Sequence, residues 1–441
     1  MDAPAPAAPA AACVRSWRRN PWWIPPFLGG VPDLEPALLR TLGLVTLGMF
    51  FEAYDLSLLT AALKQIGEGL GIPAGEFGFT LGVIRTGGLV AFAIVPLADR
   101  WGRRRVFLGS LVAMSLGTVA TAFAQTPHQF LAIQVATRGF LASAAAVGVV
   151  MLTEEMPAAH RGWGIGMLGA LAACGHGLGA LVFAAVDVLP FGWRALYALG
   201  VIPLLFLPRI RGALPETARF REHARQQGDE QRGGLAASLR SLLALARSHP
   251  GRAAGVGFTG FVEAFGSISA FSFAAWYAQT AHAWAPWQYS TMVLTAGGVG
   301  IIGNIVAGRL GDRFGRRAVG FVTFAIYPLA AIGFYSGPGW ALPACFALIV
   351  AMGSASDVVV RAFSTELFPT SQRGASAAWV TLLQTLGFIL GPLVVGALSP
   401  QPEDLPRTIR AVATTLFAAG LFVWMLPETR GRELEALSQE S

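Results

Sequence analysis

The sequence predicts an all-α membrane protein with 12 transmembrane helices, arranged as two six-helix bundles related by pseudo-symmetry. Composition is the first reason: of 441 residues, 54% are hydrophobic and only 13% are charged, about half the charged fraction of an ordinary globular domain. The second is a series of apolar segments long enough to cross a bilayer. The third is a set of motifs that recur in both halves of the chain at one spacing. A soluble enzyme, a disordered chain and a disulfide scaffold all fit this composition poorly.

Each predicted span meets the same criterion, because a helix that crosses the hydrocarbon core needs about 20 mainly apolar residues. In chain order, the segments that meet it are residues 38–62, 79–98, 106–124, 128–152, 163–186, 194–208, 254–279, 289–310, 318–335, 341–360, 375–398 and 408–426. The sixth segment is the shortest, and a long polar stretch follows it. The predicted domains are an N-terminal tail at 1–37, a first bundle at 38–208, a linker at 209–252, a second bundle at 253–427 and a C-terminal tail at 428–441.

The loops between these spans differ in arginine content. When both termini are placed in the cytoplasm, most of the 32 Lys and Arg residues fall in cytoplasmic segments, as the positive-inside rule requires. The N-terminal tail lacks the charged-then-apolar order of a signal peptide. We therefore expect a multi-pass protein of the cell membrane, surrounded by lipid and able to act as a monomer. The net charge of +7 follows the loop pattern, so no nucleic-acid partner is expected.

Three motifs recur in the second half of the chain. LADRWGRR, with Asp99 and Arg103, returns 213 residues later as LGDRFGRR, with Asp312 and Arg316. TEEMPAAHRG returns after 212 residues as TELFPTSQRG, and LPET also returns after 212 residues. This shared displacement predicts two six-helix halves in tandem and in the same orientation. Parallel repeats of this kind are described for transporters whose substrate site lies near the midplane.

The acids of these motifs lie at predicted helix ends, where they are unfavourable for the helix dipole unless nearby cations offset them. We expect charge clamps across the cytoplasmic helix ends that form when this side is closed and break on opening, at about 1–3 kcal/mol. The alternative is that the arginines only anchor the loops at the membrane. The candidate gating residues are Asp99, Arg103, Glu154, Arg161, Asp312, Arg316, Glu366 and Arg373.

These motifs carry a family resemblance. PLADRWGRRR and GRLGDRFGRR resemble the loop signature of the major facilitator superfamily, and Arg138-Gly139 resembles its fourth-helix arginine motif. PETAR at 215–219 and PETRG at 427–431 are similar to motifs of the sugar-porter and organic-acid symporter branches. The resemblance covers residues 38–435 and implies the 12-helix fold of that superfamily and transport of a small molecule, not an enzymatic activity.

Charged residues inside predicted spans indicate function, because each costs about 2.5–3.5 kcal/mol at the bilayer centre. Glu52 and Asp55 lie three residues apart on one helical face, and Glu263 in VEAF mirrors Glu52 in FEAY. Arg85 lies at the predicted depth of Asp55, which predicts an ion pair, and Arg138 lies near the midplane. These three acids and two arginines are expected to form one central cluster.

The acids of this cluster are the candidate proton carriers. Two carboxylates close together in a low dielectric cannot both ionise easily, so Glu52 is the expected carrier, assisted by Asp55 and Glu263. A buried structural ion pair is the alternative for each charge. His176 is either a proton relay or a polar residue between glycine-rich helices. Gly175-x-x-x-Gly179 recurs as Gly387-x-x-x-Gly391, a spacing that permits close helix approach.

The spacing Glu52-x-x-Asp55 resembles the paired-acid motif in the first helix of the aromatic-acid/proton symporters, with Glu for the first Asp and Ala53 for Gly. We therefore predict proton-coupled symport of a small organic anion, an aromatic or aliphatic carboxylate, by alternating access. Arg85 and Arg138 are the expected carboxylate ligands, because arginine donates a planar fork. The residues expected to complete the pocket are Trp276, Tyr277, Asn304, Trp379 and Gln384.

The main alternative is proton-driven export of a hydrophobic metabolite or drug. The fifth span lacks the Gly-Pro motif that drug antiporters of the superfamily carry, which argues against export. A membrane sensor would need an appended signalling domain, and a membrane enzyme would need a nucleophile or a metal set. Cys13, Cys174 and Cys345 show no metal-ligand spacing, and the sequence has no nucleotide-binding pattern, so no metal, cofactor or catalytic residue is expected.

Overall fold

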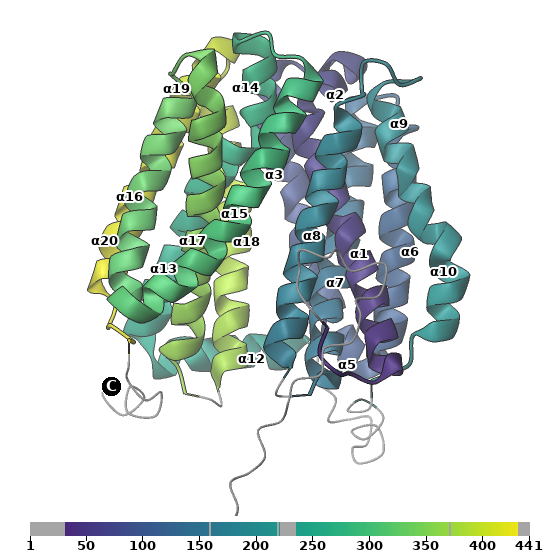
Figure 1. Ribbon diagram of the computed structural model, residues 1–441, viewed down its shortest axis with the longest axis vertical. Helices are drawn as coiled ribbons and strands as arrows, with labels where there is room; N and C mark the ends of the chain where they lie inside the picture. Colours follow the sequence, from purple (N-terminus) through teal and green to yellow (C-terminus); the bar gives the residue numbers. More distant parts are fainter. Residues whose placement is uncertain (1–30, 158–159, 218–219, 221–234, 370–371, 431–441) are drawn as a thin grey trace, which may run out of the picture.

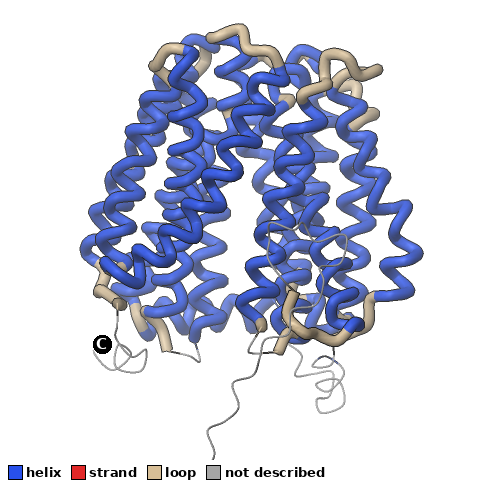
Figure 2. Tube along the Cα trace, viewed as in Figure 1, coloured by secondary structure: helices blue, strands red, loops and turns tan. Residues whose placement is uncertain are grey.

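The computed structural model describes residues 31–157, 160–217, 220, 235–369 and 372–430. Figure 2 shows this part of the chain as helices joined by short loops. In Figure 1 the helices form two groups, one from each half of the sequence. We call the end of the molecule that carries the arginine motifs, at the bottom of Figure 1, the arginine-rich end, and the opposite end the arginine-poor end.

The first half contains α1 to α10. Its helices are α1 Pro36–Ala61, α2 Leu63–Leu70, α3 Phe77–Thr86, α4 Ala91–Ile94, α5 Leu97–Trp101, α6 Arg103–Thr121, α7 Pro127–Glu155, α8 Arg161–Phe183, α9 Trp193–Ala198 and α10 Ile202–Ala213. Short 3-10 turns lie before α3, between α3 and α4 and before α10, at η2 Ala74–Glu76, η3 Gly87–Val90 and η4 Leu199–Val201.

The second half contains α13 to α20, and α12 lies in the predicted linker. These helices are α12 Leu235–Ser248, α13 Pro250–Ser272, α14 Ala274–Ala281, α15 Pro286–Phe314, α16 Arg316–Phe334, α17 Leu342–Glu366, α18 Arg373–Leu398, α19 Leu405–Thr414 and α20 Leu416–Met425, with 3-10 turns η6 Gly339–Ala341 and η8 Pro402–Asp404. In Figure 1, α12 lies at the arginine-rich end, between the two groups.

Eleven segments of the described chain are long and apolar enough to cross a membrane. They correspond to every predicted span except the third. That span is α6, whose 19 residues begin with three arginines, so a full-length apolar window cannot avoid charge. α6 packs along α7 and runs through the height of the first group in Figure 1. The prediction of an all-α membrane protein is confirmed, and α6 supplies the twelfth crossing.

Some helix ends differ from the predicted ones. The sixth span occupies Trp193–Ala213, not 194–208, because the apolar criterion stops at Arg209 whereas α10 continues until the extended backbone of Leu214 ends it. The tenth span likewise continues past residue 360 to Glu366. Charged side chains are therefore part of these helices near the arginine-rich end.

Glycines at matching positions allow the first helix of each half to pack closely on the fifth. A Cβ atom on Gly175 would lie 2.1 Å from the carbonyl oxygen of Phe50, between α8 and α1. A Cβ atom on Gly387 would lie 2.4 Å from the carbonyl oxygen of Phe261, between α18 and α13. Both contacts are too close for any other residue, so the repeated G-x-x-x-G motif brings the backbones together.

The two halves contact each other mainly toward the arginine-poor end. α3 packs against α18, where a Cβ atom on Gly78 would lie 2.3 Å from the backbone nitrogen of Gly396. The rings of Phe183 on α8 and Tyr289 on α15 meet edge to face at 6.0 Å. Toward the arginine-rich end α15 is largely exposed, and only 22% of its apolar window is buried, the smallest share among the eleven segments. The halves therefore separate toward the arginine-rich end.

Candidate functional site

Four charged residues gather inside the first half, and we call them the first-half cluster: Glu52, Asp55, Arg85 and Arg138. α1 places the two acids one turn apart on the same face. Arg138 on α7 lies close enough to both acids for direct electrostatic attraction, and close enough to Arg85 on α3 for repulsion. His176 on α8 also faces the charge of Arg138. The cluster thus draws on four helices around one guanidinium.

Glycines bring the second predicted span against α7 at this level. A Cβ atom on Gly87 would lie 2.0 Å from the carbonyl oxygen of Val135 and 3.0 Å from the Cβ of Arg138. One on Gly139 would lie 3.0 Å from the Cβ of Val90. The glycine that follows Arg138 therefore serves close packing, and this packing sets the two arginines side by side.

Asp55 does not pair with Arg85. The Asp55 carboxylate is 2% exposed and accepts a hydrogen bond of 2.8 Å from Oγ1 of Thr118 on α6. Arg85 is 7% exposed, and its Nη2 donates instead to Oγ of Ser272 on α13, at 3.0 Å. The predicted ion pair is wrong because equal depth fixes the height of two side chains but not the direction in which each leaves its helix.

Both arginines keep unused hydrogen-bond donors. Nη1 of Arg138 and Nε of Arg85 are buried and have no hydrogen-bond partner among the described residues. A buried donor left without a partner costs about 1–3 kcal/mol, and more on a charged group. Glu52 is only half-buried, so it is the more accessible of the two acids. The cluster can therefore accept an anion at its arginines and a proton at its acids.

Glu263 belongs to a different cluster. Its carboxylate is 5% exposed and accepts a hydrogen bond of 3.2 Å from Nε2 of Gln384 on α18. Its charged neighbours are Asp357 and Arg361 on α17, which pair with each other at 2.7 Å. The expected single cluster of three acids and two arginines is wrong, because the pseudo-symmetry that relates Glu263 to Glu52 places it in the other half.

Asp357 and Arg361 were missed from the sequence. Asp357 lies inside the predicted tenth span, where the rule for intramembrane charges would have selected it. Arg361 lies just beyond the predicted end of that span at residue 360, so it was counted with a loop. The continuation of α17 to Glu366 shows that both residues stand on the helix, four positions apart.

The remaining predicted pocket residues are spread along the second half. Trp276 and Tyr277 are buried in α14 at the arginine-poor end, where the ring of Tyr277 packs 4.9 Å from that of Tyr335. The indole Nε1 of Trp379 donates to the carbonyl oxygen of Ala253 at 2.9 Å, which ties it to α13. Asn304 on α15 is exposed. The structure brings Gln384 to Glu263 but does not gather these residues into one pocket.

At the arginine-rich end, one arginine in each half bridges two acids. Nη2 of Arg103 lies 3.0 Å from both Asp99 and Glu154. This ion-pair group joins the loop after α5 to the end of α7, within the first half.

The second half repeats the arrangement. Nη2 of Arg316 lies 2.7 Å from Asp312 and 3.2 Å from Glu366. Glu366 also accepts a hydrogen bond of 2.5 Å from Thr429. Arg373 is not part of this group, and its buried Nε has no hydrogen-bond partner in the described chain. The side chain of its counterpart Arg161 lies outside the described residues.

These ion pairs lie inside each half, and they are formed although the halves separate at this end. The expectation that opening breaks them is therefore wrong for the pairs of Arg103 and Arg316. They hold the loops of one bundle together, so they can persist while the bundles move apart.

Two glutamates of the repeated LPET motif have a role that the repeat alone did not reveal. Oε1 of Glu216 accepts a hydrogen bond of 3.1 Å from the backbone nitrogen of Arg104, at the start of α6. The carboxylate of Glu428 accepts bonds of 2.9 and 3.2 Å from the backbone nitrogens of Arg316 and Arg317, at the start of α16. An acid at a helix N-terminus is favourable for the helix dipole.

Glycine makes this approach possible in both halves. Gly102 and Gly315 precede α6 and α16 with φ of 100° and 99°, a conformation that residues with a side chain rarely adopt. A Cβ atom on Gly102 would lie 2.4 Å from Oε2 of Glu216, and one on Gly315 would lie 2.5 Å from Oε2 of Glu428. The glycine of the D-R-x-G motif and the glutamate of the P-E-T motif therefore form one unit.

Comparison with known proteins adds to this geometry. The model of the Major Facilitator Superfamily matches residues 45–273 and 256–441. The chain is 26% identical over 429 residues to the gallate transporter of Pseudomonas putida, covering 88% of this chain and 92% of that protein. It is 25% identical over 438 residues to the niacin transporter NiaP of Acinetobacter baylyi, covering 90% and 95%.

A solved structure shares the fold. The inward open conformation of the xylose transporter XylE from E. coli superposes with a TM-score of 0.71 at 18% identity, covering 91% of this chain and 99% of that one. This similarity concerns the arrangement of the helices alone.

Proposed function

The chain belongs to the Major Facilitator Superfamily, and we propose that this multi-pass secondary transporter imports a small organic anion together with protons. The favoured substrate class is an aromatic carboxylate. The proposal concerns the substrate and the coupling, since transport rather than enzymatic activity already follows from the family. One observation carries it: Arg138 is a buried guanidinium with an unused donor beside two acids.

Arg138 is the proposed carboxylate ligand. Its planar fork can donate two parallel hydrogen bonds to a carboxylate, the strongest of the ordinary hydrogen-bonded pairs. The unused Nη1 supplies a donor for the first of these bonds. Arg85 contributes positive charge nearby and one further unused donor, its Nε. A sugar would gain little from two arginines, whereas an anion gains from both.

Coupling to protons follows from competition for Arg138. While Glu52 and Asp55 are ionised, they attract the guanidinium and repel a second anion. A proton on Glu52 removes part of this attraction and releases Arg138 for the substrate carboxylate. Glu52 is the proposed carrier because it is half-buried, whereas Asp55 is held by Thr118. The acid in the second half, Glu263, is proposed to assist through its own cluster.

The substrate class rests on the relatives. The gallate and niacin transporters are named for aromatic acids, and they cover nearly the full length of this chain. The positive-inside rule supports a cytoplasmic arginine-rich end with both termini in the cytoplasm of the cell. The described conformation would then release substrate to the cytoplasm. Each half, including the predicted bundles at 38–208 and 253–427, is proposed to move as a unit within a monomer.

Transport currents on a solid-supported membrane test the proposal. Proteoliposomes receive a panel of aromatic and aliphatic carboxylates at pH 6 and pH 8. We expect a carboxylate-dependent current that is larger at pH 6, is lost in Glu52→Gln and is unchanged in Glu68→Gln. Glu68 is a matched control, because it is an exposed acid paired only with Lys64. Silence across the panel, with binding of neutral or cationic compounds, would favour the exporter and refute the symporter.

A further inference from the structure

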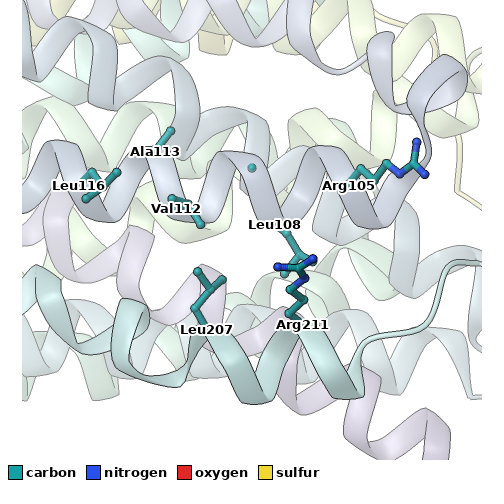
Figure 3. Close-up of a pocket in the computed structure, with 8 residues that line it drawn as sticks. Arg105, Leu108, Val112, Ala113, Leu116, Leu207 and Arg211 are labelled. Carbon is teal, nitrogen blue, oxygen red and sulfur yellow. The ribbon is translucent and has the colours of Figure 1, made fainter.

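A groove lies between α6 and α10 on the first half, away from the charged cluster. Its volume is about 470 Å³. The residues that line it most extensively are Arg105, Leu108, Val112, Leu116, Leu207 and Arg211. Figure 3 shows Val112 and Leu207 pointing toward each other from the two helices, with Arg105 and Arg211 nearer the arginine-rich end. Leu116 is 53% exposed, so the groove opens on the surface that faces lipid.

The floor of this groove depends on Gly109. A Cβ atom added to this residue would meet nothing within 4 Å, so the glycine leaves space that a side chain would fill. The guanidinium groups of Arg105 and Arg211 are exposed, and neither has an ion-pair partner among the described residues. The result is an apolar channel with two cations at one end.

The second half lacks the groove at the corresponding place. Two matching contacts identify equivalent positions, because Arg104 donates to the carbonyl of Arg211 and Arg317 donates to the carbonyl of Trp424. Trp424 therefore stands where the first half has Arg211. Its ring packs edge-on against Phe321 at 5.6 Å, so aromatic side chains meet where the first half is open.

The 213-residue displacement shows the same exchange at two more positions. Ala318 stands at the position of Arg105, and Val322 stands at the position of Gly109. Both cations and the glycine are therefore specific to the first half. Folding of the repeat does not require them, since the second half forms the same helix pair without them.

The dimensions of the groove fit a lipid chain. Arg105 and Leu116 are separated by 11 residues along α6, about 16 Å at a rise of 1.5 Å per residue. One leaflet contributes about 15 Å to a hydrocarbon core of about 30 Å. The cations lie at the membrane-boundary end of this length, where the phosphate of a lipid is found.

We propose that this groove binds one anionic phospholipid from the leaflet at the arginine-rich end. One acyl chain lies along the apolar side chains of α6 and α10, and the phosphate is held between Arg105 and Arg211. A bound lipid would link α10 to α6, whose N-terminus is already held by Glu216 beyond the end of α10. The lipid therefore stabilises the first half and leaves the transport cluster untouched.

Native mass spectrometry of the purified full chain tests this inference. Phosphatidylglycerol and phosphatidylcholine with identical acyl chains are added separately to the detergent-solubilised protein. We expect one phosphatidylglycerol to be retained, more tightly than phosphatidylcholine. Each arginine near a phosphate contributes about fivefold in affinity. The double variant Arg105→Gln/Arg211→Gln should therefore lose about 25-fold in affinity for phosphatidylglycerol and little for phosphatidylcholine.

Two further variants separate this site from general surface charge. Arg309→Gln/Arg313→Gln removes the same charge from exposed positions on α15 and should leave binding unchanged. Gly109→Val introduces the residue of the second half and should weaken both lipids by filling the groove. If the double variant does not fold, each single arginine substitution provides the same comparison at about fivefold. Equal binding of the two lipids, an equal loss in the α15 control, or a protein dimer in place of the lipid adduct would overturn the proposal.

Discussion

The hydrogen bond from Arg85 to Ser272 joins the two halves on the side where they meet, and Ser272→Ala removes it. This bond is 3.0 Å long and buried, and a hydrogen bond to a charged group contributes about 1.5–3 kcal/mol. Losing it leaves Arg85 with a second unused donor in this conformation. We therefore expect the balance to move away from the state open at the arginine-rich end by about 10- to 100-fold.

Cysteine accessibility measures this shift. Asn304→Cys places a thiol on the exposed part of α15, in a background in which Cys13, Cys174 and Cys345 are replaced by alanine. A membrane-impermeant maleimide should label this position more slowly in Ser272→Ala, because the arginine-rich end spends less time open.

Ser269→Ala is the matched control for this experiment. Ser269 lies on the same helix and is fully buried, but its hydroxyl has no hydrogen-bond partner among the described residues. Its removal should leave the labelling rate unchanged. Equal rates in Ser272→Ala and wild type, or an equal slowing in Ser269→Ala, would refute the reasoning that the Arg85 bond stabilises this state.

Three further predictions concern the substrate ligand, the helix caps and the glycine contacts. Arg138→Lys keeps the charge but loses the planar fork, so the KM for a carboxylate in proteoliposome currents should rise about tenfold or more, whereas a substrate bound by charge alone would show little change. Glu428→Ala removes two charged hydrogen bonds at the start of α16 and Glu216→Ala removes one at the start of α6; unfolding in mixed detergent and SDS should show losses of about 3 and about 1.5 kcal/mol, and equal losses would contradict the count of bonds. Gly387→Ala places a Cβ atom 2.4 Å from a backbone oxygen and should lower stability by about 1–3 kcal/mol, whereas Gly297→Ala meets open space and should be neutral or stabilising in the same assay.

The limits of sequence reasoning are clearest at the buried charges. Glu52, Asp55, Arg85 and Arg138 were all selected correctly as charged residues inside spans, and the structure gathers them in one half. The pairing of Asp55 with Arg85 was wrong. Adjacent residues on a helix point about 100° apart, and the rotation of each helix about its own axis is not contained in a hydropathy pattern.

The repeated motifs show the same limit. Their displacement predicted that Asp99, Arg103 and Glu154 have counterparts, and the structure forms the same ion pairs in both halves. Whether those pairs lie within one half or between halves could not be read from the repeat. The role of Glu216 was hidden for a related reason, because it binds a backbone nitrogen, and backbone groups leave no signal in the sequence.

The sequence by itself therefore determined the all-α membrane class, the number of crossings and the tandem repeat. These properties depend on averages over about 20 residues and on self-similarity along the chain, neither of which needs three-dimensional contacts. Only the tertiary structure decided which side chains meet. It placed Arg85 against Ser272 and Glu263 beside Asp357, because partners are chosen by helix rotation and by the close approaches that single glycines allow. The groove at Gly109 has the same origin, since it exists only where two packed helices leave space between them.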